Sequence, residues 1–152
     1  MAQLSLKEAM YWQQTEGNRV HCLLCPHGCR IAPSEVGLCR VRQNMDGVLR
    51  TLTYDRVSAV PSDPIEQQPL FHFYPGSQVF SMGTLGCNFH CKHCQNWEIS
   101  MADGQAISPT CQHMQPRAAI EAAKHYRCQG IAWTYNEPAV WFDYTLDCAK
   151  LA

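Results

Sequence analysis

The sequence predicts an α/β fold, with a cysteine-rich α+β N-terminal module over residues 1–77 and the start of a parallel sheet with crossover helices over residues 78–152. Three observations support this. Short apolar runs are typical of strands, the order strand–loop–helix–strand–helix follows residue 78, and seven of the ten cysteines fall into two compact groups. Strands that alternate with helices form parallel sheets with right-handed crossovers.

Composition limits the classes of function. With 46% hydrophobic residues, the chain can form a packed core, and its net charge of −1 argues against nucleic acid and anionic membrane as partners. No apolar run approaches the roughly 18–20 residues that span a bilayer, and the N-terminus lacks the apolar segment of a signal peptide. We therefore expect a cytoplasmic protein.

The N-terminal module is expected to mix one helix with strands. The pattern predicts a helix over residues 5–16, with Ser5 and Glu8 as a capping box and Gly17 as its end. Residues 48–54 (VLRTLTY) alternate like a strand, and the preceding Asp46-Gly47 pair predicts a hairpin turn.

Residues 61–77 (PSDPIEQQPLFHFYPGS) are rich in proline and aromatic residues. Because they include few flexible polar residues, they predict an ordered connector. Their aromatic side chains could line a substrate channel, but we expect them to cover the bottom or side of a core.

The second half predicts two βα units. QVFSMGT (78–84) and IAWTY (131–135) are expected to be buried strands, and a helix with Pro116 at its first turn ends before Gly130. Residues 138–152 predict a second helix. Its apolar face consists of Val140, Trp141, Tyr144, Cys148 and Leu151.

Two βα units cannot close a parallel sheet, both faces of which need cover. Because the sequence stops within the last predicted helix, we expect it to be the N-terminal fragment of a longer protein. The alternative is a complete small domain that buries its open edge in a partner.

The first candidate metal centre is the loop Cys87-x3-Cys91-x2-Cys94, at the carboxyl end of a strand, where α/β proteins bind ligands. Thiolates suit zinc or iron–sulfur clusters. A structural zinc ion would need a fourth ligand, which His90 or His93 could supply. A four-iron cluster held by these cysteines would instead leave one iron open to a substrate or cofactor. Glycines beside the loop would allow the backbone to approach a bulky cluster closely.

This loop resembles the cluster motif of the radical SAM (S-adenosylmethionine) superfamily, within SMGTLGCNFHCKHCQNWEIS and with TYNEP one βα unit later. Including HCLLCPHGC and DPIEQQPLFHFYPGS, nearly the whole chain is similar to the N-terminal part of the radical SAM enzyme of the AmmeMemoRadiSam system. That enzyme is related to pyruvate formate-lyase activating enzymes. The resemblance implies a partial radical SAM barrel and an oxidoreductase.

The resemblance also implies cofactors and partners. Cys87, Cys91 and Cys94 would bind a [4Fe–4S] cluster whose open iron holds S-adenosylmethionine. Its reductive cleavage would give a 5′-deoxyadenosyl radical that abstracts hydrogen from a substrate. Flavodoxin or ferredoxin would supply the electron, and the substrate could be the glycyl site of a partner enzyme, another protein or a small molecule.

Three further residues match cofactor-binding positions of the superfamily. His93 lies where an aromatic residue often packs near the adenine; it could equally be an ordinary loop residue. Asn136 and Glu137 correspond to the Gly-Gly-Glu motif that meets the methionine amino group, with Tyr135 and Asn136 in place of the glycines. A carboxylate can accept a charge-assisted hydrogen bond from that ammonium, although Glu137 could instead stabilise the N-terminus of the following helix.

Four cysteines near the N-terminus form a second candidate metal site. They suit a closed zinc site or a second iron–sulfur cluster, and the alternative is four reduced core thiols. They are Cys22, Cys25, Cys29 and Cys39. We expect the remaining three, Cys111, Cys128 and Cys148, to act as small buried hydrophobic residues.

A rival function follows from the same cysteines. With zinc at both groups, the chain would be a zinc-stabilised binding module without catalytic activity. The colour and metal content of the purified protein would distinguish this module from an iron–sulfur enzyme.

Overall fold

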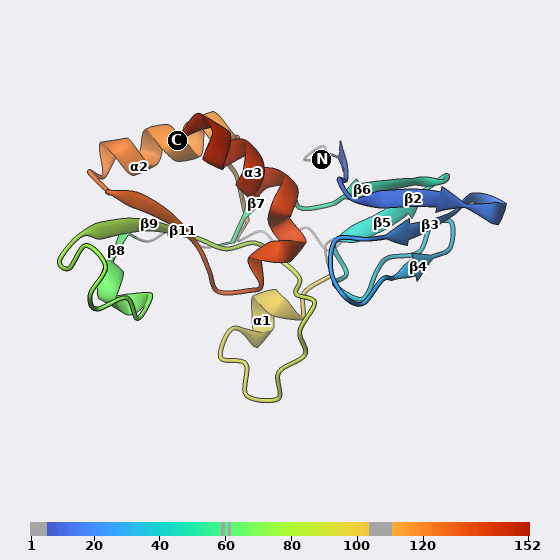
Figure 1. Cartoon of the computed structure of the whole chain (residues 1–152), viewed down its shortest axis with the longest axis horizontal. Coiled ribbons are helices and arrows are strands. Elements are labelled where there is room, and N and C mark those ends of the chain that lie inside the picture. Colours follow the sequence, from blue (N-terminus) through green and yellow to red (C-terminus); the bar gives the residue numbers. More distant parts are fainter. Residues whose placement is uncertain (1–5, 59, 61, 104–110) are drawn as a thin grey trace.

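The computed structural model describes residues 6–58, 60, 62–103 and 111–152. The N-terminal part folds into two antiparallel three-stranded sheets (Figure 1). One has the order β1-β6-β5, from β1 (Lys7–Glu8), β6 (Val48–Thr51) and β5 (Arg42–Met45). The other has the order β2-β3-β4, from β2 (Trp12–Thr15), β3 (Arg19–Cys22) and β4 (Arg30–Ile31).

The predicted helix over residues 5–16 is wrong. Ser5 lies outside the described residues, Glu8 pairs with Arg50 in the first sheet, and Tyr11 has a left-handed φ of 57° that no helix contains. Pairing with β3 and β6 outweighs the local helical pattern, because it buries Ala9 beside Val20 and Leu49.

The predicted hairpin at Asp46-Gly47 is confirmed. β5 and β6 pair with Met45 opposite Val48, and both turn residues have positive φ, 53° for Asp46 and 86° for Gly47. These values are typical of the two-residue turns that match the twist of a hairpin. The side chain of Asn44 accepts a hydrogen bond from Gly47 N at 2.8 Å and fixes the turn.

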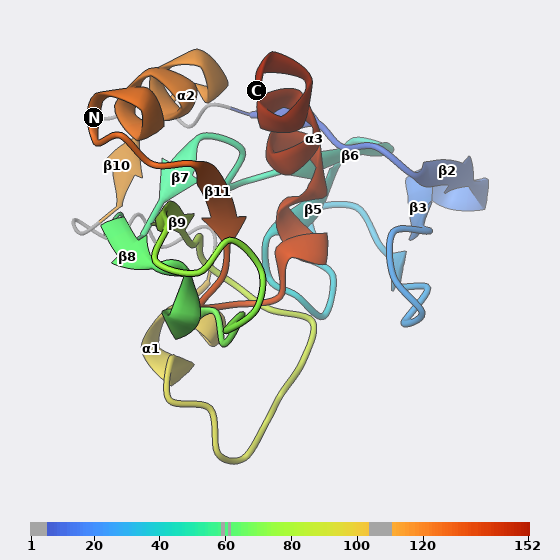
Figure 2. The same cartoon turned by 60° about the vertical axis from the view of Figure 1, so that its left-hand side comes forward.

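The C-terminal half contains the parallel pair that the sequence predicts. β9 (Gln78–Met82) and β11 (Gly130–Trp133) run parallel, and β8 (Ser62–Pro64) pairs antiparallel with β9 at the sheet edge. In Figures 1 and 2, α2 and α3 lie over one face of this sheet. The helices are α1 (Trp97–Ser100), α2 (Pro116–His125) and α3 (Phe142–Leu151), with single 3-10 turns at η1 (Glu16–Asn18), η2 (Ile65–Gln67) and η3 (Pro138–Trp141). The short strands β7 (Arg56–Val57) and β10 (Gln112–His113) pair antiparallel.

The largest core lies between this sheet and its two helices. Phe80 and Met82 of β9 pack against Ala119 of α2 and against Trp141 and Tyr144. The apolar face predicted for residues 138–152 is therefore buried, as is Cys148, except that Leu151 is 44% exposed. Cys111 and Cys128 are only half-buried. In the described part of the chain, no helix is both long and apolar enough to cross a membrane.

A buried ion pair joins the two halves. Arg42 of β5 contacts Asp143 of α3, and both side chains are at most 2% exposed. Arg42 Nη1 also donates to Met10 O at 2.8 Å, and Met10 N donates to Asp143 Oδ1 at 2.6 Å. β8, which precedes residue 77, pairs with β9, which follows it, so the two halves also share a sheet. The domain boundary at residue 77 stays a prediction.

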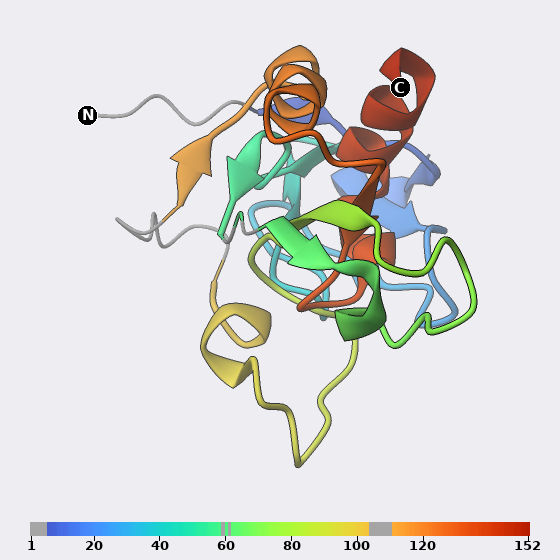
Figure 3. The same cartoon turned by 90° about the vertical axis from the view of Figure 1, so that its left-hand side faces the viewer.

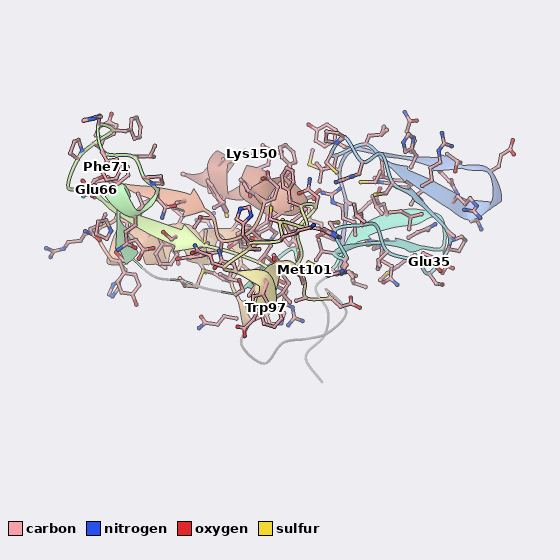
Figure 4. All side chains as sticks on the ribbon, turned by 90° about the horizontal axis from the view of Figure 1, so that it is seen from below. Glu35, Glu66, Phe71, Trp97, Met101 and Lys150 are labelled. Carbon is pink, nitrogen blue, oxygen red and sulfur yellow. The ribbon has the colours of Figure 1, made fainter. Side chains whose placement is uncertain are left out.

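The aromatic side chains of the connector do not cover a core. Phe71, Phe73 and Tyr74 are 58–70% exposed, and among the described residues 62–77 only Ile65 is a buried apolar side chain. Figure 4 shows Glu66 and Phe71 at the end of the molecule far from Glu35. Phe73 and Tyr74 instead border a cavity of ≈ 560 Å³ that Val79 and Ile131 also line. This position agrees better with the alternative that the aromatic side chains line a substrate channel.

Candidate metal centre

The three-cysteine loop leaves the carboxyl end of β9 and returns to α1. Cys87 is buried at its base, Cys91 is exposed at its far end, and Cys94 is half-buried where the chain turns, with Cys94 N donating to Cys91 O at 3.2 Å. Figure 3 shows this loop projecting away from the two sheet regions. A projecting loop leaves one side of the sulfurs open to a ligand.

The environment of the sulfurs fits a thiolate-bound metal group. Phe89 N donates to Cys87 Sγ at 3.4 Å, and Cys94 Sγ lies 3.4 Å from the buried Ser100 hydroxyl. Asn88 Oδ1, between two of the cysteines, is buried with no hydrogen-bond partner among the described residues. Soft sulfur donors and spare polar capacity suit an iron–sulfur cluster.

The structure does not bring the three sulfur atoms of the loop close enough together to hold a metal. Among the described residues, no three Cys, His, Asp or Glu side chains form a ready metal-ligand set. Metal sites are seldom preformed in the absence of the metal, so a metal group bound here would require the loop to close around it. Cys91, which is exposed, lies at the far end of this loop.

Asn136 fixes the base of the loop. Its Nδ2 donates to Gly86 O at 2.5 Å, and its Oδ1 accepts from Thr84 N at 3.3 Å. Asn96 Nδ2, just before α1, donates to Tyr135 O at 2.9 Å and ties the other end of the loop to the same turn. No local sequence pattern indicated this role for Asn96.

The two glycines beside the loop pack closely against other parts of the protein, and the close approach to a cluster that the sequence suggested stays a prediction. A Cβ on Gly83 would lie 2.9 Å from the Tyr135 ring, and one on Gly86 would lie 2.4 Å from Cys39 O and 2.5 Å from Val41. Gly86 also has a φ of +76°. These glycines let the loop base pack against the end of β11 and the N-terminal module.

The predicted cofactor-binding residues lie in different settings. His93 is exposed on the loop, while Asn136 and Glu137 follow β11 at the same sheet edge as the loop. Glu137 Oε1 accepts from Ala139 N at 3.3 Å and caps η3, the structural role weighed above. Tyr135 adopts a φ of 71°, a conformation that glycine would adopt without strain. The pKa of its phenol is raised, chiefly because the group is partly buried and secondly because the negative charge of Asp63 lies nearby.

Residues 82–152, which contain this loop and the helices α1, α2 and α3, match the family model of the radical SAM superfamily. This region is therefore similar to the radical SAM superfamily. The match begins at the end of β9, directly before the cysteine loop. The cysteine loop, β11 and the helices therefore lie in the part of the chain that is similar to the radical SAM superfamily, whose members use a [4Fe–4S] cluster and S-adenosylmethionine.

Two uncharacterized proteins of Methanocaldococcus jannaschii are similar to the chain. MJ0808 is 42% identical over 147 residues, which are 97% of this chain and 44% of that protein. MJ0674 is 30% identical over 110 residues, which are 70% of this chain and 27% of that protein. The chain thus spans less than half the length of these relatives. No solved structure matches it.

The N-terminal cysteines lie directly behind the radical SAM loop. All four border one small cavity, which Asn88 and Val140 also line. His27 Nε2 donates to Asn88 O at 2.8 Å. Burial raises the pKa of the Cys22 and Cys39 thiols. The four cysteines that border the cavity are Cys22, Cys25, Cys29 and Cys39. None of the ten cysteines of the chain forms a disulfide.

Proposed function

We propose that this chain is the cluster-binding portion of an enzyme that reductively cleaves S-adenosylmethionine. The observation that supports this most strongly is the loop of Cys87, Cys91 and Cys94 at the carboxyl end of β9, within the region that matches the radical SAM superfamily. Three ligands in a projecting loop leave a coordination position for a cofactor.

The proposed chemistry belongs to the bound cofactors, and the chain positions them. When bound and given one electron by a donor, a [4Fe–4S] cluster would supply the reductive cleavage of a C–S bond of the sulfonium and, through it, hydrogen-atom abstraction from the substrate. Cys87 would hold the cluster at the loop base, and the hydrogen bonds of Asn136 to Gly86 and Thr84 keep that base against β11.

Two residues are proposed to hold S-adenosylmethionine. Glu137 is half-buried at the sheet edge from which the loop emerges, and its carboxylate accepts hydrogen bonds, as its contact with Ala139 N illustrates. It would receive the methionine ammonium, for which a charged acceptor is well suited. His93, exposed on the loop, would pack against the adenine.

The electron donor would be a flavodoxin or ferredoxin. The substrate proposed from the resemblance to activating enzymes is the glycyl site of a partner enzyme; a small molecule or a different protein would fit the same chemistry. A cytoplasmic location, with neither nucleic acid nor membrane as a partner, also stays a prediction.

A second candidate is the zinc-stabilised module without catalysis. The observation that favours it is the cavity shared by the four N-terminal cysteines, because a closed set of four sulfurs is typical of structural zinc. It requires zinc, and no iron, at Cys87, Cys91 and Cys94.

Anaerobic reconstitution with iron and sulfide tests the proposal. We expect a brown protein with about four iron atoms per chain at the loop, and 5′-deoxyadenosine after addition of dithionite and S-adenosylmethionine. Cys91→Ala should lose this iron, whereas Cys128→Ser, a half-buried cysteine outside both groups, should keep it. A colourless protein with zinc in the loop would support the binding module instead.

A further inference from the structure

The cavity behind the cluster loop is unusual because every cysteine of the N-terminal group borders it. We propose that Cys22, Cys25, Cys29 and Cys39 bind one zinc ion, which fastens the N-terminal sheets to the cluster loop. This inference goes beyond the proposed function, because it concerns a separate metal with a structural role.

Two turns place these cysteines around the cavity, although their side chains do not form a ready metal-ligand set. Cys22 ends β3, and its N–H donates to Cys29 O at 2.9 Å, while Gly28 N donates to Cys25 O at 3.1 Å and closes the turn between them. On the other side, Arg40 N donates to Gly37 O at 2.8 Å in a second turn that carries Cys39. Paired turns that present cysteines to each other are typical of zinc ribbons.

The size of the cavity favours a single ion. Its volume is ≈ 20 Å³, room for about one water-sized body. A single zinc ion held by four sulfurs at about 2.3 Å fits such a space after small movements of the turns, whereas a second four-iron cluster would force them apart. Four sulfurs also complete the coordination of zinc, so the site would be structural.

The contacts around the cavity connect it to the cluster loop. Asn88, between two cluster ligands, lines the cavity and accepts from His27 Nε2 at 2.8 Å. On the other side, Gly86 packs so closely against Cys39 O that a Cβ would lie 2.4 Å away. A metal that holds Cys25, Cys29 and Cys39 would therefore hold the base of the cluster loop in place.

Metal analysis of the anaerobically purified chain tests the zinc site. We expect about one zinc per chain, with X-ray absorption showing four sulfurs at about 2.3 Å. Cys25→Ser should lose most of this zinc, Cys25→His should retain it because histidine can ligate zinc, and Cys128→Ser should match the unmodified chain. Zinc that is unchanged in Cys25→Ser, or iron in place of zinc, would overturn the proposal.

Two more readouts separate this site from the cluster. Cys91→Ala changes the cluster loop and should keep the zinc at the N-terminal cysteines. The zinc measurement therefore stands even if the loop binds no cluster and the proposed function fails. Cys25→Ser should also load at least twofold less iron on the cluster loop than Cys128→Ser does. Equal iron loading in the two variants would refute the fastening role.

Discussion

Gly86→Ala should be one of the most damaging single-methyl changes in the chain. Gly86 has a φ of +76°, and an added Cβ would lie 2.4 Å from Cys39 O and 2.5 Å from Val41 Cγ1. The left-handed conformation costs a non-glycine residue about 1–2 kcal/mol. Overpacking against backbone and a buried valine adds about 1–3 kcal/mol. The sum is about 2–5 kcal/mol.

Gly76→Ala is a matched control. Gly76 has nearly the same φ, +77°, but nothing lies within 4 Å of an added Cβ. It should therefore show only the conformational cost of about 1–2 kcal/mol. Urea unfolding of both variants measures the difference in their free energies of unfolding. In thermal unfolding, Gly86→Ala should lose about 5–15 °C in Tm. Equal destabilisation of the two variants would refute the packing of the cluster loop against Cys39.

Three further changes test other contacts. Asp143→Ala leaves Arg42 charged and buried, so urea unfolding should show a loss of about 3–5 kcal/mol; a loss below 1 kcal/mol would contradict the ion pair. Burial raises the pKa of the Cys148 thiol from 9.0 to about 11, so the folded chain holds this proton more tightly than the unfolded chain. Stability should therefore fall by about 1–2 kcal/mol as pH rises through that range, and less in Cys148→Ala, whereas parallel pH profiles would exclude this cause. Asn136→Ala removes both hydrogen bonds that Asn136 makes with the loop base, so it should lower iron loading on the loop. Gln129→Ala, which removes a hydrogen bond to Gln78 N instead, should lower it less; equal loading in the two variants would argue that Asn136 does not hold the loop base.

The sequence predicted the C-terminal half better than the N-terminal half. β9, α2, β11 and α3 have local apolar patterns, and α2 also has clear ends, such as Pro116 at its start. The segment over residues 5–16 has a helical pattern, but its partners in β3 and β6 decide its structure. The Gly17-Asn18 pair, both residues with positive φ, was the local sign of a hairpin.

The candidate ligands were predictable from spacing, whereas their supports were not. Cys87, Cys91 and Cys94 stand out because few structures other than metal sites need three thiols in one short loop. The hydrogen bonds of Asn136 to Gly86, and of His27 to Asn88, join residues 50 and 61 positions apart. Such contacts depend on how the halves pack, which no local pattern encodes.

The most direct test of the central claim is electron paramagnetic resonance of the anaerobically reconstituted, dithionite-reduced chain with and without S-adenosylmethionine. We predict the signal of a reduced [4Fe–4S] cluster that changes when S-adenosylmethionine is added, because the cofactor binds the iron that Cys87, Cys91 and Cys94 leave open. The absence of a cluster signal, or a signal that S-adenosylmethionine does not alter, would contradict the account.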